Sequence, residues 1–141
     1  MPTFTLSQVE HAIRGAWSAE TTFAKPEYLA GVASPARGQC GPTALVVQDL
    51  LGGDLVMADL LGPNGDGVHY WNRLGALDVD LTREQLLPGE LLQAERVVER
   101  RRPAPDGPAE TAYRLLHDRV LRTLGVPAGQ FSSASSPTPA P

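Results

Sequence analysis

The strongest constraint on the fold is a short helical segment that is apolar around almost its whole circumference. Residues 42–51 read PTALVVQDLL, and no polar face develops before Asp49. Pro42 suits the first helical turn, where its missing N–H costs no hydrogen bond, and Gly52-Gly53 end the segment. A helix that is apolar all round is stable only when other elements surround it. We therefore expect a central, buried helix.

Weaker patterns on either side predict an α+β domain, with helices and antiparallel strands in separate parts of the chain. Ser7 and Glu10 form a capping-box pattern at the start of the first helix. The expected elements are a helix over 7–17, an ordered loop over 18–38, a strand followed by a turn-rich loop over 54–67, a hairpin over 68–81 that turns at Gly75-Ala76, a short helix or turn at 82–85 and an amphipathic helix over 110–125. Residues 88–109 show no clear pattern.

The size and charge of the chain limit the possible functions. A chain of 141 residues suits a single domain, which we place at 1–125, followed by a Pro/Ser/Ala-rich tail at 126–141 that we expect to be disordered. The net charge of −4 and the scattered arginines argue against a nucleic-acid partner. No apolar run approaches the length of a membrane span, and no signal peptide is evident. We expect a cytoplasmic protein without a nucleic-acid or membrane partner.

The single cysteine, Cys40, directly precedes the apolar helix. One cysteine cannot form an internal disulfide, and a small buried residue at this point would be a sufficient structural explanation. A helix N-terminus, however, lowers the pKa of a thiol, because the unpaired backbone N–H groups and the helix dipole favour a negative charge. Cys40 is therefore a candidate nucleophile.

A cysteine nucleophile needs a histidine base, and the chain has three histidines. His11 lies within the first expected helix and His117 within the last one, where surface or packing roles are simpler. His69 opens an expected strand after a glycine-rich loop, where a side chain can be held rigidly at the rim of a cleft. We select His69 as the candidate base.

The hairpin supplies a geometric test for a third catalytic residue. If the turn has an even number of residues, as Gly75-Ala76 does, His69 and Asp80 point to the same face of the hairpin. Asp78 shares this face but lies nearer the turn. The alternative role for Asp80 is to cap the turn over 82–85. We expect Asp80 to orient the imidazole of His69.

Several neighbours of Cys40 are candidates for binding the substrate. The backbone N–H of Cys40 and the side-chain amide of Gln39 are candidate donors to the oxyanion of a tetrahedral intermediate. Gly38 and Gly41 leave room for a substrate backbone. We add Trp71, in the same strand as the candidate base, to the expected substrate-binding residues.

Three blocks of the sequence, SPARGQCGPTALVVQDLLGG, HYWNRL and DVDLTREQ, closely resemble the YunG-like bacterial proteins, a family of small papain-like cysteine-fold proteins. The resemblance runs from about residue 17 to the last helix. It implies a papain-like or transglutaminase-like domain, in which the nucleophile-bearing central helix packs on a small antiparallel sheet. It also implies the chain order Cys40, His69 and Asp80 for the triad. Papain-type peptidases carry their oxyanion glutamine several residues before the cysteine, whereas Gln39 is adjacent to it.

Two functions follow as expectations. The first is a cysteine hydrolase or acyltransferase that forms a covalent acyl-thioester with a small-molecule or peptide amide, ester or thioester; peptidase, amidase, deamidase and biosynthetic acyl transfer all share this chemistry. The second is a binding or regulatory module on the same scaffold. We expect no cofactor, and no metal site because the cysteine and histidines lack ligand-type spacing. We expect the loops over 18–38 and 60–68 to form the two walls of the substrate cleft.

Overall fold

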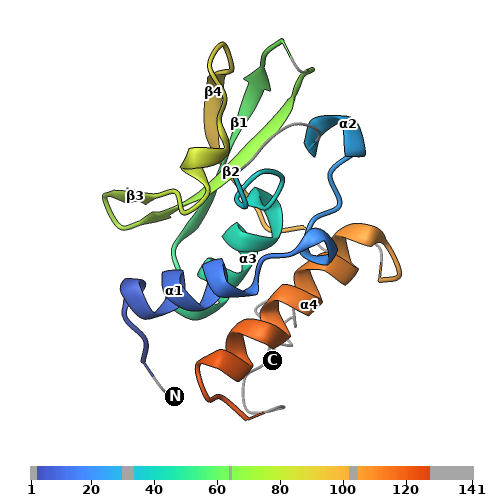
Figure 1. Cartoon of the computed structure of the whole chain (residues 1–141). Coiled ribbons are helices and arrows are strands. Elements are labelled where there is room, and N and C mark those ends of the chain that lie inside the picture. The colour runs from blue at the N-terminus through green and yellow to red at the C-terminus, as the bar shows by residue number, and fades with distance from the viewer. Residues whose placement is uncertain (1–2, 30–33, 64, 102–104, 128–141) are drawn as a thin grey trace.

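The computed structural model describes residues 3–29, 34–63, 65–101 and 105–127. These residues form an α+β domain with a helical layer and a four-stranded antiparallel sheet in the order β3-β2-β1-β4 (Figure 1). The main helices are α1 (Leu6–Ala16), α3 (Cys40–Leu51) and α4 (Pro108–Thr123). The strands are β1 (Asp54–Leu61), β2 (Gly67–Leu74), β3 (Leu77–Val79) and β4 (Leu91–Val98). Three short helical segments complete the fold: η1 (Ala19–Thr21), α2 (Pro26–Leu29) and η2 (Arg83–Gln85). The expected α+β class is confirmed.

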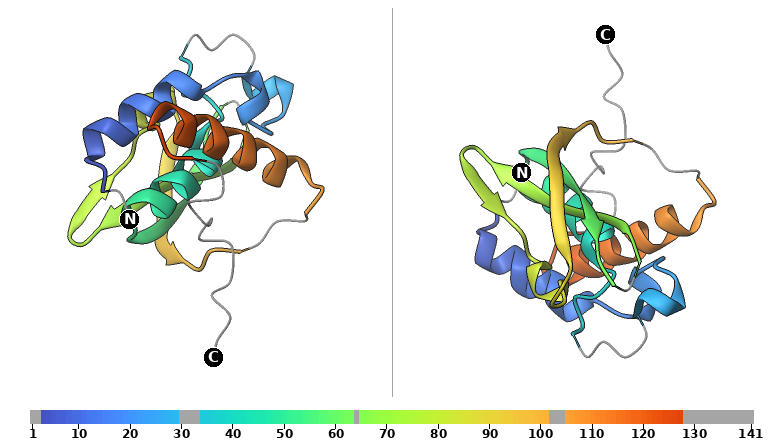
Figure 2. Two further views of the ribbon diagram at one scale, coloured as in Figure 1. Left: turned by 90° about the horizontal axis from the view of Figure 1, so that it is seen from below. Right: turned by 90° about the horizontal axis from the view of Figure 1, so that it is seen from above.

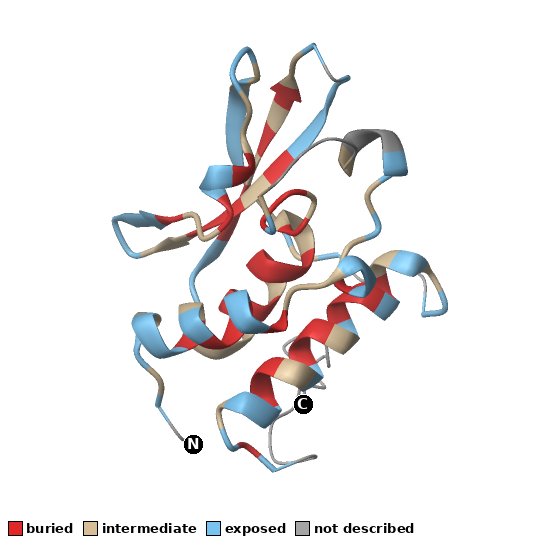
Figure 3. Ribbon diagram, in the orientation of Figure 1, coloured by how far each residue is buried: buried red, intermediate tan, exposed pale blue. Residues whose placement is uncertain are grey.

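Helix α3 occupies the centre of the domain, as its apolar sequence predicts. It contacts β1 and β2 of the sheet, and it also contacts α1 and α4 (Figure 2). Val46 and Val47 of α3 are completely buried, and the inward faces of α1 and α4 pack against them (Figure 3). The buried side chains of this core are Val9, Ala12, Ile13, Ala16, Val46, Val47, Tyr113, Leu116 and Val120.

The hairpin between β2 and β3 has the predicted two-residue turn. Leu74 pairs with Leu77, so Gly75 and Ala76 form the turn, and Gly75 has a positive φ of 63°. Because the turn has an even number of residues, Asp80 falls on the face that carries His69. Asn72 points to the opposite face, where its side-chain amide donates a hydrogen bond to the carbonyl of Ala44 in α3 (2.9 Å). The hairpin is thereby attached to the central helix.

Strand β4 lies within the segment in which the sequence predicts no strand. It pairs only with β1, at the edge of the sheet, and most of its side chains are exposed. An edge strand exposed in this way does not need the alternation of apolar and polar residues that marks a half-buried strand. The ladder is also interrupted between Met57 and Asp59, and Ala94 has a positive φ of 58°. The irregular pairing explains why no strand pattern is visible in the sequence.

The helix ends differ in detail from those predicted. The capping box of α1 is formed by Thr5 and Gln8, which shows that the prediction of Ser7 and Glu10 is wrong. Helix α4 ends at Thr123, with Leu124 as its C-cap, and the N–H of Val126 bonds to the carbonyl of Leu121, so Val126 is buried against the domain. Most of the expected tail, residues 128–141, lies outside the described residues. None of the helices in the described part of the chain is long and apolar enough to cross a membrane.

Candidate active site

Cys40 is the first residue of α3, and its side chain is partly exposed. The chain reaches it through Gly38, whose φ of 79° lies in the left-handed region, and through Gln39, the N-cap residue. The thiol lies beside β2, close enough to the backbone N–H of Tyr70 for that group to lower the pKa of Cys40. The helix N-terminus therefore places the thiol next to the strand that carries His69.

His69 and Asp80 form a short hydrogen bond, with 2.6 Å between His69 Nε2 and Asp80 Oδ2. The side chain of His69 is 1% exposed, and its ring lies 5.7 Å from that of Trp71. The second oxygen of Asp80, Oδ1, accepts from the backbone N–H of Thr82 (3.2 Å). The two roles considered for Asp80 therefore coexist: one oxygen holds the start of the turn and the other holds the imidazole.

The other ring nitrogen of His69 contacts Gln85, the last residue of η2. Gln85 is completely buried. Its Oε1 accepts from the backbone N–H of Gly38 (2.8 Å), and its Nε2 lies 2.9 Å from His69 Nδ1. Because Oε1 is assigned by this bond, Nε2 must be the donor to Nδ1, and the neutral imidazole then carries its proton on Nε2, facing Asp80. The lone pair of Nδ1, on the side of the ring away from Asp80, accepts this hydrogen bond.

The pKa values of Cys40 and His69 shift in opposite directions. Burial opposes the thiolate, but the hydrogen bond and charge of His69, together with bonds from Tyr70 and Gln85, lower the pKa of Cys40 below its ordinary value. Burial likewise opposes the imidazolium, but the hydrogen bond that His69 donates to Asp80 and the interaction with Cys40 raise the pKa of His69 to about 9. These shifts favour a thiolate–imidazolium pair near neutral pH.

A buried ion pair supports this network from behind. Arg37 Nη1 and Nη2 donate to the two carboxylate oxygens of Glu90 at 2.8 and 3.0 Å, and both side chains are almost completely buried. Arg37 also donates to the backbone carbonyl of Gln85 (3.1 Å). The ion pair therefore joins the loop that leads to Cys40 to the segment that carries Gln85. Neither residue, nor Gln85, was singled out for the site from the sequence, because no local pattern connects positions so far apart.

The structure brings the predicted triad together but gives the other candidates different surroundings. The amide of Gln39 is buried and faces η1, where Nε2 donates to the Ser18 carbonyl and Oε1 accepts from the Thr21 hydroxyl. The oxyanion role considered for Gln39 therefore has no support from its position. A β-carbon at Gly38 would lie 2.8 Å from side-chain atoms of Leu29 and of Thr22, so Gly38 serves close packing rather than space for a substrate.

Trp71 and Asp78, the acidic residue nearest the hairpin turn, lie on the same face of the hairpin as His69. The indole N–H of Trp71 donates to Asp78 (3.2 Å), and Arg73 donates to both oxygens of the same carboxylate. Asp78 is thus paired outside the His69 network. His117 is buried beside Tyr113 of the same helix, while His11 is exposed on α1.

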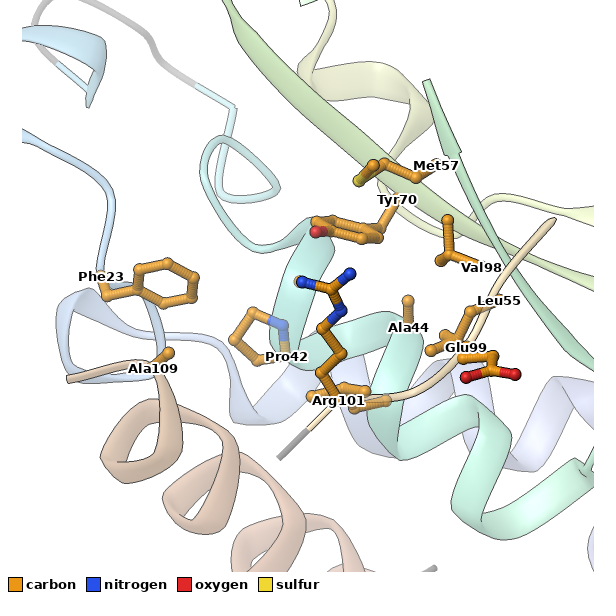
Figure 4. A pocket seen from close by; sticks show the side chains of 12 residues that line it. Phe23, Pro42, Ala44, Leu55, Met57, Tyr70, Val98, Glu99, Arg101 and Ala109 are labelled. Atoms are coloured by element: carbon orange, nitrogen blue, oxygen red, sulfur yellow. The ribbon is translucent and has the colours of Figure 1, made fainter. Parts of the chain in front are cut away.

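A pocket of about 660 Å³ lies between α3 and the sheet (Figure 4); Cys40 and His69 are not among the residues that line it. Gly41 and Tyr70, the neighbours of the candidate nucleophile and base, both line it. Phe23 also lines it, which agrees with the expectation that the 18–38 segment forms one wall. None of the described residues of 60–68 lines this pocket, so that expectation is wrong here; β4 and the segment after it, including Val98, form the opposite side.

In the described part of the chain, no group of three or more His, Cys, Asp or Glu side chains is arranged to hold a metal ion. The model of a protein family described as YunG protein matches residues 5–125. No curated protein and no solved structure matches the chain.

Proposed function

The chain belongs to the YunG protein family, and from this premise and the geometry of the site we propose that it is a cysteine hydrolase or acyltransferase on a papain-like scaffold. The short hydrogen bond between His69 and Asp80, together with a Cys40 thiol close enough to the same imidazole for each to shift the pKa of the other, carries the proposal. A thiol at the start of a central helix, with a histidine and a carboxylate on neighbouring strands of an antiparallel sheet, is the arrangement that covalent acyl transfer needs.

The first half of the reaction uses Nδ1 of His69 as the base. Nδ1 takes the thiol proton of Cys40 when the thiolate–imidazolium pair forms, and the sulfur of this pair then attacks the carbonyl carbon of an amide, ester or thioester. The tetrahedral intermediate collapses when the imidazolium gives this proton to the leaving nitrogen, oxygen or sulfur. The acyl group then remains on Cys40 as a thioester, and Asp80 stays ionised throughout.

The second half resolves the acyl-enzyme. Water or an amine replaces the departed group, gives a proton to Nδ1 of His69 and attacks the thioester carbonyl. Collapse of the second intermediate expels the Cys40 sulfur, which regains its proton from the imidazolium. The acceptor alone decides between hydrolysis and transfer, so a small-molecule or peptide acyl donor suits both outcomes.

Gln85 replaces Gln39 in this proposal as the amide that supports the reacting groups. Its Nε2 hydrogen bonds to the neutral imidazole at Nδ1, and its amide lies close enough to Cys40 to lower the pKa of the thiol. When Nδ1 becomes protonated, the same amide donor turns wholly toward the negatively charged sulfur. Gln85 therefore stabilises the thiolate and holds the imidazole in the tautomer that the first proton transfer requires.

The proposal is tested by incubating the protein with a panel of amides and aryl thioesters and measuring its intact mass. We expect an acyl adduct that peptide mapping places on Cys40, and no adduct on Cys40→Ala. Cys40→Ala should keep nearly the stability of the parent protein, because the thiol lies at the helix entrance and not in the core. Absence of any acyl adduct, together with a thiol that is alkylated only near pH 8.5, would favour a binding or regulatory module instead.

A further inference from the structure

The pocket between α3 and the sheet has the size and lining of a site for a small apolar ligand. Its volume of about 660 Å³ lies within the range of about 300–1,000 Å³ that is usual for ligand pockets. The lining is mostly apolar and comes from the 18–38 segment, α3, the sheet and the start of α4, with Phe23, Pro42, Leu55, Met57, Val98 and Ala109 among its members (Figure 4). Such a lining favours an apolar group of the substrate.

One guanidinium group interrupts this apolar lining. Figure 4 shows the side chain of Arg101 extending across the pocket toward the ring of Tyr70, with Phe23 and Pro42 on one side and Val98 on the other. Among the described residues, no carboxylate lies within the 4.0 Å ion-pair distance of Arg101; Glu99 lines the same pocket but is not paired with it. An arginine in this position offers a planar set of donors to a carboxylate of the ligand.

Tyr70 connects this cation to the catalytic groups. Its backbone N–H lies close enough to Cys40 to lower the pKa of the thiol, and its ring lines the pocket within electrostatic range of Arg101. Burial and the nearby Cys40 raise the pKa of the phenol, so the hydroxyl stays protonated and can donate a hydrogen bond at neutral pH. A ligand anion at Arg101 therefore has a second donor on the side that leads to the reacting sulfur.

We propose that the substrate is an amide of an apolar amino acid that keeps a free carboxylate. The carboxylate pairs with Arg101 and the hydroxyl of Tyr70, and the apolar side chain fills the pocket. Apolar lining lies on both sides of the guanidinium, so the carboxylate and the apolar group branch from one part of the ligand rather than lie at its opposite ends. This inference rests on the proposed function, because it names the acyl donor from which Cys40 would take its acyl group.

Chloroacetyl amino acids test the recognition step without knowledge of the natural substrate. In these compounds the Cys40 sulfur displaces chloride from the methylene carbon and forms a thioether. Chloroacetyl-leucine carries both the carboxylate and the apolar group, chloroacetyl-leucinamide lacks the charge, and chloroacetyl-glycine lacks the apolar side chain. The measurement is the second-order rate constant for modification of Cys40 by each compound, with iodoacetamide as the measure of intrinsic thiol reactivity.

We expect chloroacetyl-leucine to react about three- to tenfold faster than chloroacetyl-leucinamide, and at least about tenfold faster than chloroacetyl-glycine. Arg101→Gln should abolish the first preference when each rate is divided by the iodoacetamide rate of the same variant. The matched control is Arg122→Gln, which removes the same charge from the last turn of α4; it should change neither ratio. Phe23→Ala should reduce the preference for leucine over glycine.

The outcomes separate this inference from the proposed function. Equal rates for chloroacetyl-leucine and its amide, or a preference that survives Arg101→Gln, would overturn the inference while a reactive Cys40 left the proposed function standing. A Cys40 that reacts with iodoacetamide only near pH 8.5 and forms no acyl adduct would overturn both.

Discussion

At the scale of single residues, the imidazole of His69 has a different partner on each of its two nitrogens. Asp80 accepts from Nε2, Gln85 contacts Nδ1, and Cys40 lies close enough to the ring to shift its pKa. A buried histidine that only stabilised the fold would not require a thiol beside its ring. The reactivity of Cys40 is therefore the most direct measurement of how these side chains interact.

We expect the rate of Cys40 alkylation to rise with pH. The midpoint of this rise should lie below the ordinary thiol pKa of about 8.5. The sign follows from the shifts: a lowered thiol pKa keeps the sulfur ionised at lower pH, and the imidazolium persists up to the raised His69 pKa of about 9. Acyl transfer should therefore follow a bell-shaped pH profile that declines above about pH 9. The rate of iodoacetamide alkylation measured from pH 4 to 10 gives the midpoint for Cys40. A midpoint at or above pH 8.5 would contradict the prediction.

Replacing Asp80 tests whether its carboxylate orients the imidazole of His69 or only lies beside it. Asp80→Ala should slow turnover by about 10²-fold or more, by analogy with other orienting residues, and should shift the alkylation midpoint of Cys40 upward. The matched control is Asp78→Ala on the same face of the hairpin, because Asp78 pairs with Arg73 and Trp71 instead. A pH–rate series on both variants is the measurement, and equal shifts would contradict the assignment.

Gln85 offers an isosteric test of the amide donor. In Gln85→Glu a carboxylate would face Nδ1 of His69 and the sulfur of Cys40, so negative charge would oppose the thiolate and raise the alkylation midpoint. We expect acyl transfer to fall by about 10- to 100-fold, as for the loss of one oriented donor. Gln8→Glu makes the same change in the exposed capping box of α1 and should alter neither quantity. An unchanged midpoint in Gln85→Glu would remove Gln85 from the site.

At the scale of elements, the site depends on how two loops are joined. The segment before α3 and the segment around η2 meet through Arg37, Glu90 and the backbone of Gln85. Glu90 also accepts from the backbone N–H of Leu87, and the Arg37 guanidinium lowers the pKa of its carboxyl despite burial, which acts in the opposite direction. This ion pair keeps the amide of Gln85 facing the imidazole.

Breaking the buried pair should be costly. Glu90→Gln leaves the Arg37 charge buried without its anion, and we expect a loss of about 3–5 kcal/mol in the free energy of unfolding. Glu84→Gln, which breaks the exposed Arg14–Glu84 pair, should cost no more than about 1 kcal/mol. Urea unfolding of both variants is the measurement, and similar losses would show that the buried pair does not hold the loops together.

At the scale of the whole molecule, one helix connects the sheet to the helical layer. α3 carries Cys40 at its start and packs through Val46 and Val47 against α1 and α4, while Asn72 of β2 bonds to its backbone. The contact between α3 and β2 therefore holds the nucleophile and the base together, while the packing of α3 against α1 and α4 forms a separate part of the core.

The same arrangement predicts that core packing and thiol reactivity separate. Leu116 of α4 is completely buried in the helical core and does not contact the catalytic network through any described hydrogen bond. Leu116→Ala should lower the free energy of unfolding by about 2–5 kcal/mol and leave the alkylation midpoint of Cys40 unchanged while the protein is folded. Urea unfolding combined with alkylation kinetics checks this, and a shifted midpoint would show that the core controls the site directly.

Local sequence patterns were sufficient to predict the features that depend on period and turn length. The apolar run predicts a central helix, and a two-residue turn at Gly75-Ala76 puts His69 and Asp80 on one face because side chains alternate along a strand. These relations hold within a few residues of chain or across one tight hairpin. They were enough to select Cys40, His69 and Asp80, which the structure brings together.

Tertiary structure alone decided the rest of the site. Arg37 meets the backbone of Gln85 across 48 residues of chain and Glu90 across 53, and no periodicity relates such positions. Gln39 is adjacent to Cys40 in the chain, yet its amide faces Ser18 and Thr21, because the N-cap position directs it into the loop rather than toward the thiol. The sequence determines which residues are adjacent along the chain, but tertiary packing determines which side chains are in contact. For this reason the amide that contacts His69 is that of Gln85.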